Sequence, residues 1–159
     1  MKRRFLFALL AALPVVALAQ LPEPAGPQAE LPKEKLTIVT RTGATHVFNV
    51  EMALTGEQQM VGEMFRTSVP ADGGMLFDWG APRASMMWMK NTLVPLDMVF
   101  INADGSIRAI AENTVPQSLA TIDSRGPVRA TLEVAGGTTA KLDIRVGDRV
   151  QQRIFGTAQ

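Results

Sequence analysis

A short run of polar and aromatic residues is the part of the sequence best suited to chemistry. It reads Met86-Met87-Trp88-Met89-Lys90-Asn91-Thr92-Leu93-Val94-Pro95-Leu96-Asp97. Tryptophan offers a flat apolar face, lysine a positive charge, asparagine both a donor and an acceptor, and aspartate a carboxylate. Such a set can hold an anionic group and orient hydroxyl groups in a small pocket. The candidate ligand-binding residues are therefore Arg66, Trp88, Lys90, Asn91, Asp97 and Glu112.

The expected local structure brings these side chains together. If residues 84–90 form a strand, Trp88 and Lys90 share one of its faces, and the break at Pro95 lets Asp97 return towards them. Asp97 opens a run, residues 96–101, that is apolar on both faces. Its carboxylate should therefore be partly buried and need a partner. The expected partners are Lys90, Arg66 or the backbone at Asn91 and Thr92.

Two interpretations of this cluster involve no catalysis. The plainer one is a buried structural ion pair with a turn cap, in which Asp97 serves only stability. The other is a small-ligand pocket, in which Arg66 and Lys90 hold an anionic group and Trp88 stacks on an apolar or sugar face. We prefer a binding or accessory role to catalysis and assign no catalytic residue.

Two further alternatives stay open. A hydrolase would use Asp97 with Glu112 or Glu133 as acid and base, which requires one raised pKa and a separation of roughly 5 to 9.5 Å. A metal-binding protein would use the methionines around Trp88, because thioethers hold Cu(I) or Ag(I) and an indole ring can cap the ion. Strand alternation opposes this second arrangement, since it puts Met87 and Met89 on one face and Met86 on the other.

The elements that position these residues are predicted from periodicity. Residues 36–41 and 45–52 form a hairpin, and a capping box of Thr55 and Gln58 opens a helix over about residues 56–64. The later elements are short strands at 74–79, 84–89, 96–101, 106–113, 128–134 and 148–155, with a helical turn near 138–142. The first four of these strands are read as a meander. The fold class is thus α+β, mainly β, with a curled or barrel-like, mostly antiparallel sheet and one or two short helices.

The N-terminal segment has the pattern of a secretory signal. Residues 2–4 are basic, residues 5–18 are apolar apart from one proline, and Ala17-Leu18-Ala19 is a small-x-small cleavage site. The apolar stretch is shorter than the roughly 20 residues that span a bilayer. We expect a signal peptide at 1–19, a proline-rich disordered linker at 20–35, one domain at 36–155 and a tail at 156–159. The product should be soluble and periplasmic in a Gram-negative cell, or otherwise secreted.

Composition excludes several classes of protein. The chain has 159 residues and no cysteine, which rules out disulfides, thiolate zinc sites and cysteine nucleophiles. A single histidine, His46, excludes a multi-histidine metal centre. Once the three basic residues of the signal are removed, 13 basic residues face 15 acidic ones. This net charge of −2 argues against nucleic-acid binding.

The sequence also resembles a known family, domain of unknown function 192. The run from Trp88 to Asp97 is similar to the family's central aromatic-Met-Lys-Asn-Thr…Pro-Leu-Asp signature. Further motifs fall in the family's order: Gly62-Glu63-Met64-Phe65-Arg66, Gly74-Met75-Leu76-Phe77, Glu112 with Pro116, Leu132-Glu133 and Gly147-Asp148-Arg149-Val150. The resemblance covers about residues 50–150 and implies a compact β-rich fold without an established activity. Glu63 departs from it, since the family usually has a hydrophobic residue there, and this suggests an exposed helix face.

The sequence therefore predicts an exported, uncharacterised small domain that binds rather than catalyses. We expect a small-molecule ligand or a periplasmic protein as its partner, and a monomer. No cofactor, no metal, no nucleic acid and, after signal cleavage, no membrane contact are expected.

Overall fold

The chain begins its regular structure with the predicted hairpin. The structure is a computed structural model that describes residues 23–157, so the predicted signal peptide lies outside the described residues. Strand β1 (Lys33–Val39) pairs with β2 (Thr45–Ala53) in antiparallel register. Helix α1 (Gly56–Val61) follows, opened by the capping box that the sequence predicts.

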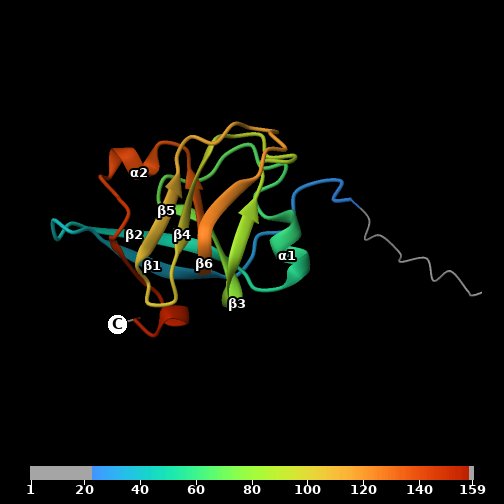
Figure 1. The fold of residues 1–159 in the computed structure, drawn as a ribbon. Helices are drawn as coiled ribbons and strands as arrows, with labels where there is room; N and C mark the ends of the chain where they lie inside the picture. The colour runs from blue at the N-terminus through green and yellow to red at the C-terminus, as the bar shows by residue number, and fades with distance from the viewer. Residues whose placement is uncertain (1–22, 158–159) are drawn as a thin grey trace, which may run out of the picture.

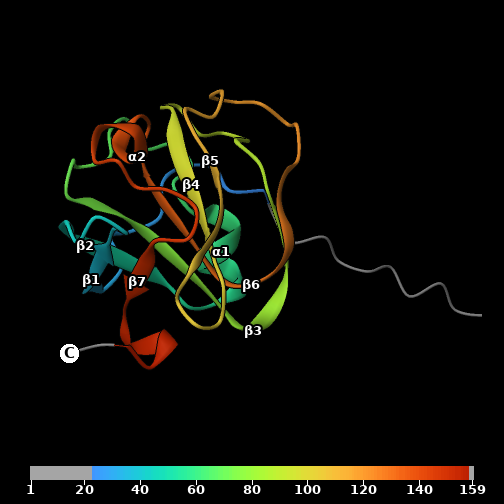
Figure 2. The same cartoon turned by 60° about the vertical axis from the view of Figure 1, so that its left-hand side comes forward.

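Seven strands form one curled sheet that makes a half-barrel, as Figures 1 and 2 show. The remaining elements are β3 (Gly73–Met87), β4 (Leu96–Ile101), β5 (Ile107–Ala111), β6 (Ile122–Ala135), α2 (Thr138–Lys141), β7 (Arg149–Gln151) and a 3-10 turn, η1 (Arg153–Phe155). The strand order is β5-β4-β6-β3-β2-β1-β7. The two edge strands come together at one point, where Ser106 bridges to Arg149. The predicted curled, mainly β fold is confirmed.

The predicted meander is wrong. Residues 74–79 and 84–89 belong largely to one long strand, β3, because its pairing with β6 continues past a bulge between Asp78 and Arg83. Gly80 takes a φ of 76° within this bulge, which bends the strand without ending it. Strand β6 then lies between β3 and β4, so β3 and β4 are not neighbours. The last predicted strand is likewise shorter and ends before η1.

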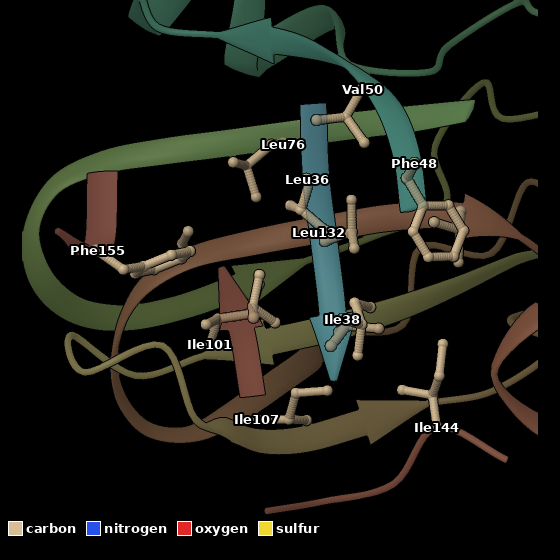
Figure 3. Packing of buried hydrophobic residues seen from close by; sticks show 14 of the residues in the cluster. Leu36, Ile38, Phe48, Val50, Leu76, Ile101, Ile107, Leu132, Ile144 and Phe155 are labelled. Atoms are coloured by element: carbon tan, nitrogen blue, oxygen red, sulfur yellow. The ribbon is translucent and has the colours of Figure 1, made fainter. Parts of the chain in front are cut away.

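Both faces of the central strands are buried. The inner face of the curl carries the main core, which includes Leu36, Phe48, Leu76 and Leu132 (Figure 3). The outer face carries two smaller apolar clusters, one around Met98 and Phe100 and one around Met75 and Phe77. Every residue of β4 is therefore buried.

The segment before β1 lies against the domain. Residues 24–32 contain no helix or strand, as their prolines predict. The Gln28 side chain nevertheless donates to the backbone carbonyls of Gln58, at 3.1 Å, and Gly62, at 3.0 Å. These carbonyls lie at the C-terminal end of α1, where that of Gln58 also accepts from the Gly62 N–H at 2.9 Å. Gln28 thus holds the predicted linker against the end of the helix.

Within residues 23–157, no helix is long and apolar enough to cross a bilayer.

Candidate functional site

Two carboxyl groups project from one row on the outer face of the sheet. In the strand register, Met75 of β3 lies opposite Glu51 of β2 on one side and Glu133 of β6 on the other. Directly paired residues point to the same face, so all three side chains lie on the face that α1 covers. Glu51 and Glu133 are each only 4% exposed.

A third carboxyl group arrives from the end of α1. The helix stops at Val61 because Gly62 takes a φ of 51°, and a Cβ there would lie 3.0 Å from Cζ of Phe77. The Gln59 side chain fixes the helix by donating to backbone carbonyls of β2 and β3. Glu63 follows directly and is 3% exposed. The expectation of an exposed Glu63 is therefore wrong, because the close contact between Gly62 and Phe77 turns this residue towards the sheet.

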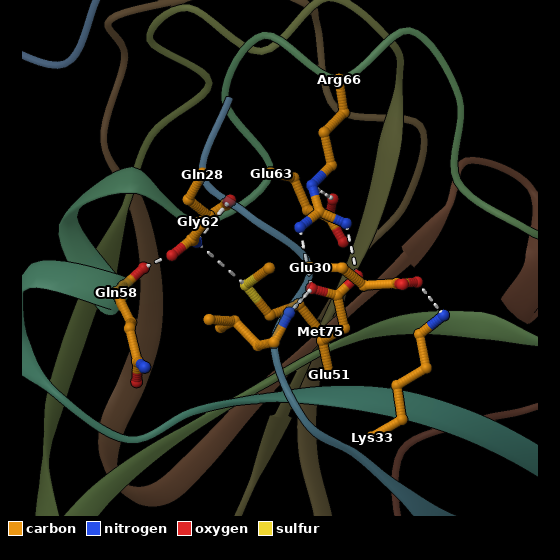
Figure 4. Close-up of polar contacts among 10 residues, drawn as sticks. Gln28, Glu30, Lys33, Glu51, Gln58, Gly62, Glu63, Arg66 and Met75 are labelled. Carbon is orange, nitrogen blue, oxygen red and sulfur yellow. Dashed lines mark hydrogen bonds and ion pairs between the residues drawn. The ribbon is translucent and has the colours of Figure 1, made fainter. Parts of the chain in front are cut away.

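Arg66 neutralises one of the three carboxylates. Its Nη1 and Nη2 atoms donate to the two oxygens of Glu51 at 2.5 and 2.8 Å, a bidentate pair (Figure 4). The backbone N–H of Leu31 adds a further bond to Glu51 at 2.8 Å. Nε of Arg66 lies 3.2 Å from Oε2 of Glu63, close enough for an ion pair but misaligned for a hydrogen bond. That Oε2 atom is buried with no hydrogen-bond partner among the described residues.

These environments give the three carboxyl groups different pKa values. Burial raises the pKa of Glu63 to about 7, with Arg66 opposing the rise and Glu51 adding to it. Burial, together with the negative charge of Glu63, raises the pKa of Glu133 well above its usual range. Burial also acts on Glu51, but the hydrogen bonds from Arg66 and Leu31 outweigh it and lower the pKa of that group. The pKa of Glu51 is thus lowered and that of Glu133 is raised, while Glu63 is partly protonated at neutral pH.

A pocket of about 330 Å³ opens between α1 and β3, next to these acids. Figure 1 shows the helix lying beside the strand. Glu63 and Glu133 both line the pocket, and Arg83 stands at its side with its guanidinium carbon 4.2 Å from the ring centre of Trp79. The apolar lining includes Met60, Met64, Phe77, Trp79, Met87 and Trp88. Both tryptophans of the chain therefore contribute to this one pocket.

Part of the predicted cluster lies near this pocket. Trp88 lines it and is 47% exposed. Strand β3 ends at Met87, so Trp88 and Lys90 do not share a strand face as expected. Lys90 Nζ still lies 5.3 Å from the Trp88 ring centre, and it donates to Glu23 at 2.6 Å. Asn91 takes a φ of 55°, and its carbonyl accepts a hydrogen bond from the N–H of Phe65 at 2.8 Å, which fixes the chain leaving α1.

Asp97 and Glu112 lie away from this pocket, at the start of α2. The Asp97 carboxylate is fully buried and accepts hydrogen bonds from the backbone N–H groups of Asn113, Gly137 and Thr139 at 2.8 to 2.9 Å. The Thr139 hydroxyl lies 2.7 Å from Asp97 and 3.3 Å from Glu112. Asp97 thus caps the start of α2, where Gly137 has no side chain to do so. The partners expected from the sequence, Lys90, Arg66 and the backbone at Asn91 and Thr92, are not the ones it has.

The register separates one carboxyl pair of the hydrolase alternative, Asp97 with Glu133, whereas the other pair, Asp97 with Glu112, shares the Thr139 hydroxyl. Asp97 pairs with Val134, and its neighbour Met98 pairs with Glu133. Because successive residues of a strand alternate in direction, Asp97 and Glu133 point to opposite faces of the sheet. The carboxyl group that acts on Glu133 is Glu63 instead.

The methionines of the metal-binding alternative are also divided. Met86 and Met87 line the pocket, and Met86 is 72% exposed. Met89 is fully buried in an outer-face cluster, where the Thr114 hydroxyl lies 3.1 Å from its sulfur. In residues 23–157, no three His, Cys, Asp or Glu side chains are grouped so as to hold a metal ion.

The comparisons with known proteins agree with this picture of the fold. The sequence profile of DUF192, domain of unknown function 192, described as "Uncharacterized ACR", matches residues 37–152. The chain belongs to this family. A crystal structure from Sinorhizobium meliloti 1021, titled provisionally as a transcription regulator, is 46% identical with a TM-score of 0.77, over 80% of this chain and 98% of that one. A protein of unknown function from Novosphingobium aromaticivorans is 35% identical with a TM-score of 0.75, over 89% and 100%. No curated protein matches significantly.

Sequence reasoning missed Glu51 and Glu63 as site residues and named Glu133 only within the hydrolase alternative. One sequence feature could have indicated a buried outer face with these acids: residues 96–101 are apolar on both faces. A strand buried on both sides implies that the outer face of its neighbour β6, which carries Glu133, is covered too.

Proposed function

We propose that the protein binds a small molecule in the pocket between α1 and β3, and acts by binding rather than by catalysis. The observation that carries this proposal is the pair of nearly fully buried carboxyl groups, Glu63 and Glu133, facing an open pocket with methionine and tryptophan walls. Apolar walls with a few convergent polar groups and perturbed pKa values are typical of ligand sites.

The two pKa shifts favour binding over acid–base catalysis. Hydrolysis by a carboxyl pair requires environments that push the two pKa values apart, so that one group is a base while the other is an acid. Here burial raises the pKa of both carboxyl groups that line the pocket, Glu63 and Glu133, whereas Glu51, whose pKa is lowered, is paired with Arg66 and does not line the pocket. A charge of −2 after signal cleavage also disfavours a nucleic-acid ligand, although the S. meliloti relative is provisionally described as a transcription regulator.

The test is a thermal-shift panel of Ag(I), Zn(II), sugars, peptidoglycan fragments, nucleotides, small carboxylates and organic amines. Ligand at about 100 times its Kd stabilises by roughly 2.7 kcal/mol, which raises the Tm by several degrees at this size. The matched variants are Trp88→Ala and Leu119→Ala, because both side chains are exposed but Trp88 lines the pocket and Leu119 does not. A shift retained by Leu119→Ala and lost by Trp88→Ala supports the proposal. A shift with Ag(I) alone favours the methionine site, and no shift with any compound contradicts small-molecule binding.

We also propose that the protein is exported and released as a monomer by cleavage after Ala19. The basic, apolar and small-residue segments of the first 19 residues support this. Mass spectrometry of the protein recovered from the periplasm or medium should give Gln20 as its first residue. An intact N-terminus in the cytoplasm would contradict export.

A further inference from the structure

The pocket and the acidic cluster beside it have more negative than positive groups. Glu63 and Glu133 line the pocket together with Arg83, and Glu51 and Arg66 adjoin them outside its lining. These five groups carry a formal charge of −1 when every carboxyl is ionised. Both Nη atoms of Arg66 are already bonded to Glu51. Glu63 therefore has only the misaligned ion pair with Nε of the same Arg66, and no ion pair reaches Glu133 within residues 23–157.

The same two carboxyl groups lack hydrogen-bond donors. Oε2 of Glu63 is buried without a partner, and no hydrogen bond reaches the Glu133 carboxyl within the described residues. Buried polar groups in folded proteins are almost always satisfied, so these oxygens suit a ligand that brings N–H donors. A primary ammonium group carries three such donors and one positive charge. A multivalent metal ion would require a larger set of converging ligands than this pair.

The walls suit the remainder of such a ligand. The Arg83 and Lys90 side chains already lie over the rings of Trp79 and Trp88, so these rings contact the hydrocarbon of the ligand rather than its ammonium group. Methionine side chains adapt to apolar groups of varied shape. The volume of about 330 Å³ is at the small end for ligand pockets, which limits the apolar part of the ligand to a short chain or a single ring.

We infer that the ligand is a primary ammonium ion with a short apolar body, bound with its ammonium group between Glu63 and Glu133 and its hydrocarbon along the methionine and tryptophan walls. This inference rests on the proposed function of the pocket. Binding converts one protonated carboxyl group into a carboxylate that accepts from the ammonium ion, and the displaced proton is released to water. The net charge of the site is then the same before and after binding, because the bound ammonium ion brings one positive charge and the released proton removes one.

Three probes with the same hydrocarbon test this inference: hexylammonium, hexanol and hexanoate. Tryptophan fluorescence is the readout, because both tryptophans line the pocket. We expect hexylammonium to bind roughly tenfold or more tightly than hexanol, with hexanoate weakest. Its affinity should rise between about pH 6 and about pH 8, since protons compete for the same carboxyl groups. Glu63→Gln and Glu133→Gln should each remove the preference, whereas Glu57→Gln, an exposed position on α1, should keep it.

Calorimetry of the unaltered protein in two buffers of different ionisation enthalpy gives a second measurement that needs no variant. Proton release on hexylammonium binding supports the inference. Equal or tighter binding of hexanol or hexanoate overturns the ammonium assignment while leaving a ligand pocket in place. If none of the three probes changes the fluorescence, the ammonium assignment also fails, and the thermal-shift panel decides separately whether the pocket binds anything.

Discussion

Replacing Glu63 by glutamine should make the stability of the protein less dependent on pH. The folded state raises the pKa of this carboxyl group from 4.5 to about 7. Between these values the folded protein holds more protons than the unfolded chain, so the free energy of unfolding falls as the pH rises. The shift corresponds to about 3 kcal/mol for a buried group, lost between about pH 4.5 and about pH 7. Glutamine does not ionise, so the variant should not lose this amount.

The assay is urea unfolding of both proteins at several values between about pH 5 and about pH 8. We expect the difference in unfolding free energy, Glu63→Gln minus wild type, to grow by about 3 kcal/mol across this range. Glu57→Gln controls for the loss of a negative charge from the same segment and should show a constant difference. A constant difference for Glu63→Gln as well would refute the argument that burial keeps this group protonated.

Four further substitutions test the structural contacts by chemical unfolding. Asp97→Ala leaves three backbone N–H groups without an acceptor and should cost about 3 kcal/mol or more; a loss below about 1 kcal/mol would contradict the capping role. Gly62→Ala should cost about 1 to 3 kcal/mol, because alanine must adopt a positive φ against Phe77, and an unchanged midpoint would argue against this. Gln28→Ala should cost about 1 kcal/mol by removing the hydrogen bonds to the Gln58 and Gly62 carbonyls, whereas a segment that does not contact the helix would show no effect. Lys90→Ala breaks an exposed pair with Glu23 and the contact of Lys90 with the Trp88 ring and should cost about 1 kcal/mol; a loss well above this would point to a contact not described above.

Much of the fold could be predicted because local rules decide it. The hairpin follows from alternation around a turn, and α1 begins where the capping box places it. The predicted meander is wrong because Gly80 and Pro82 indicate a turn, whereas pairing with the distant strand β6 keeps β3 continuous through a bulge. Long-range pairing of this kind leaves no local trace in the sequence.

The candidate site was harder to predict. Trp88 was identified because its surroundings are chemically unusual, and it does line the pocket. Asp97 stood out for the same reason, but its hydrogen-bond partners are backbone N–H groups from two distant loops. The residue types in those loops do not predict this contact. Glu133 alternates with apolar neighbours and so resembles a residue on a solvent-facing surface. Glu133 is nevertheless buried, because that face of the sheet is covered and forms part of the pocket lining.

One pair of strands determines where a ligand can enter this fold. Strands β2 and β3 run parallel, and parallel neighbours cannot be joined by a tight turn. The chain from residue 54 to residue 72 must therefore pass over one face of the sheet, carrying α1 and Glu63 with it. This crossover thus supplies Glu63 and the α1 wall of the pocket, whereas strands β3 and β6 supply the opposite wall and Glu133. Substitutions within this crossover can change what the pocket recognises while the sheet is preserved, so relatives with the same fold need not share a ligand.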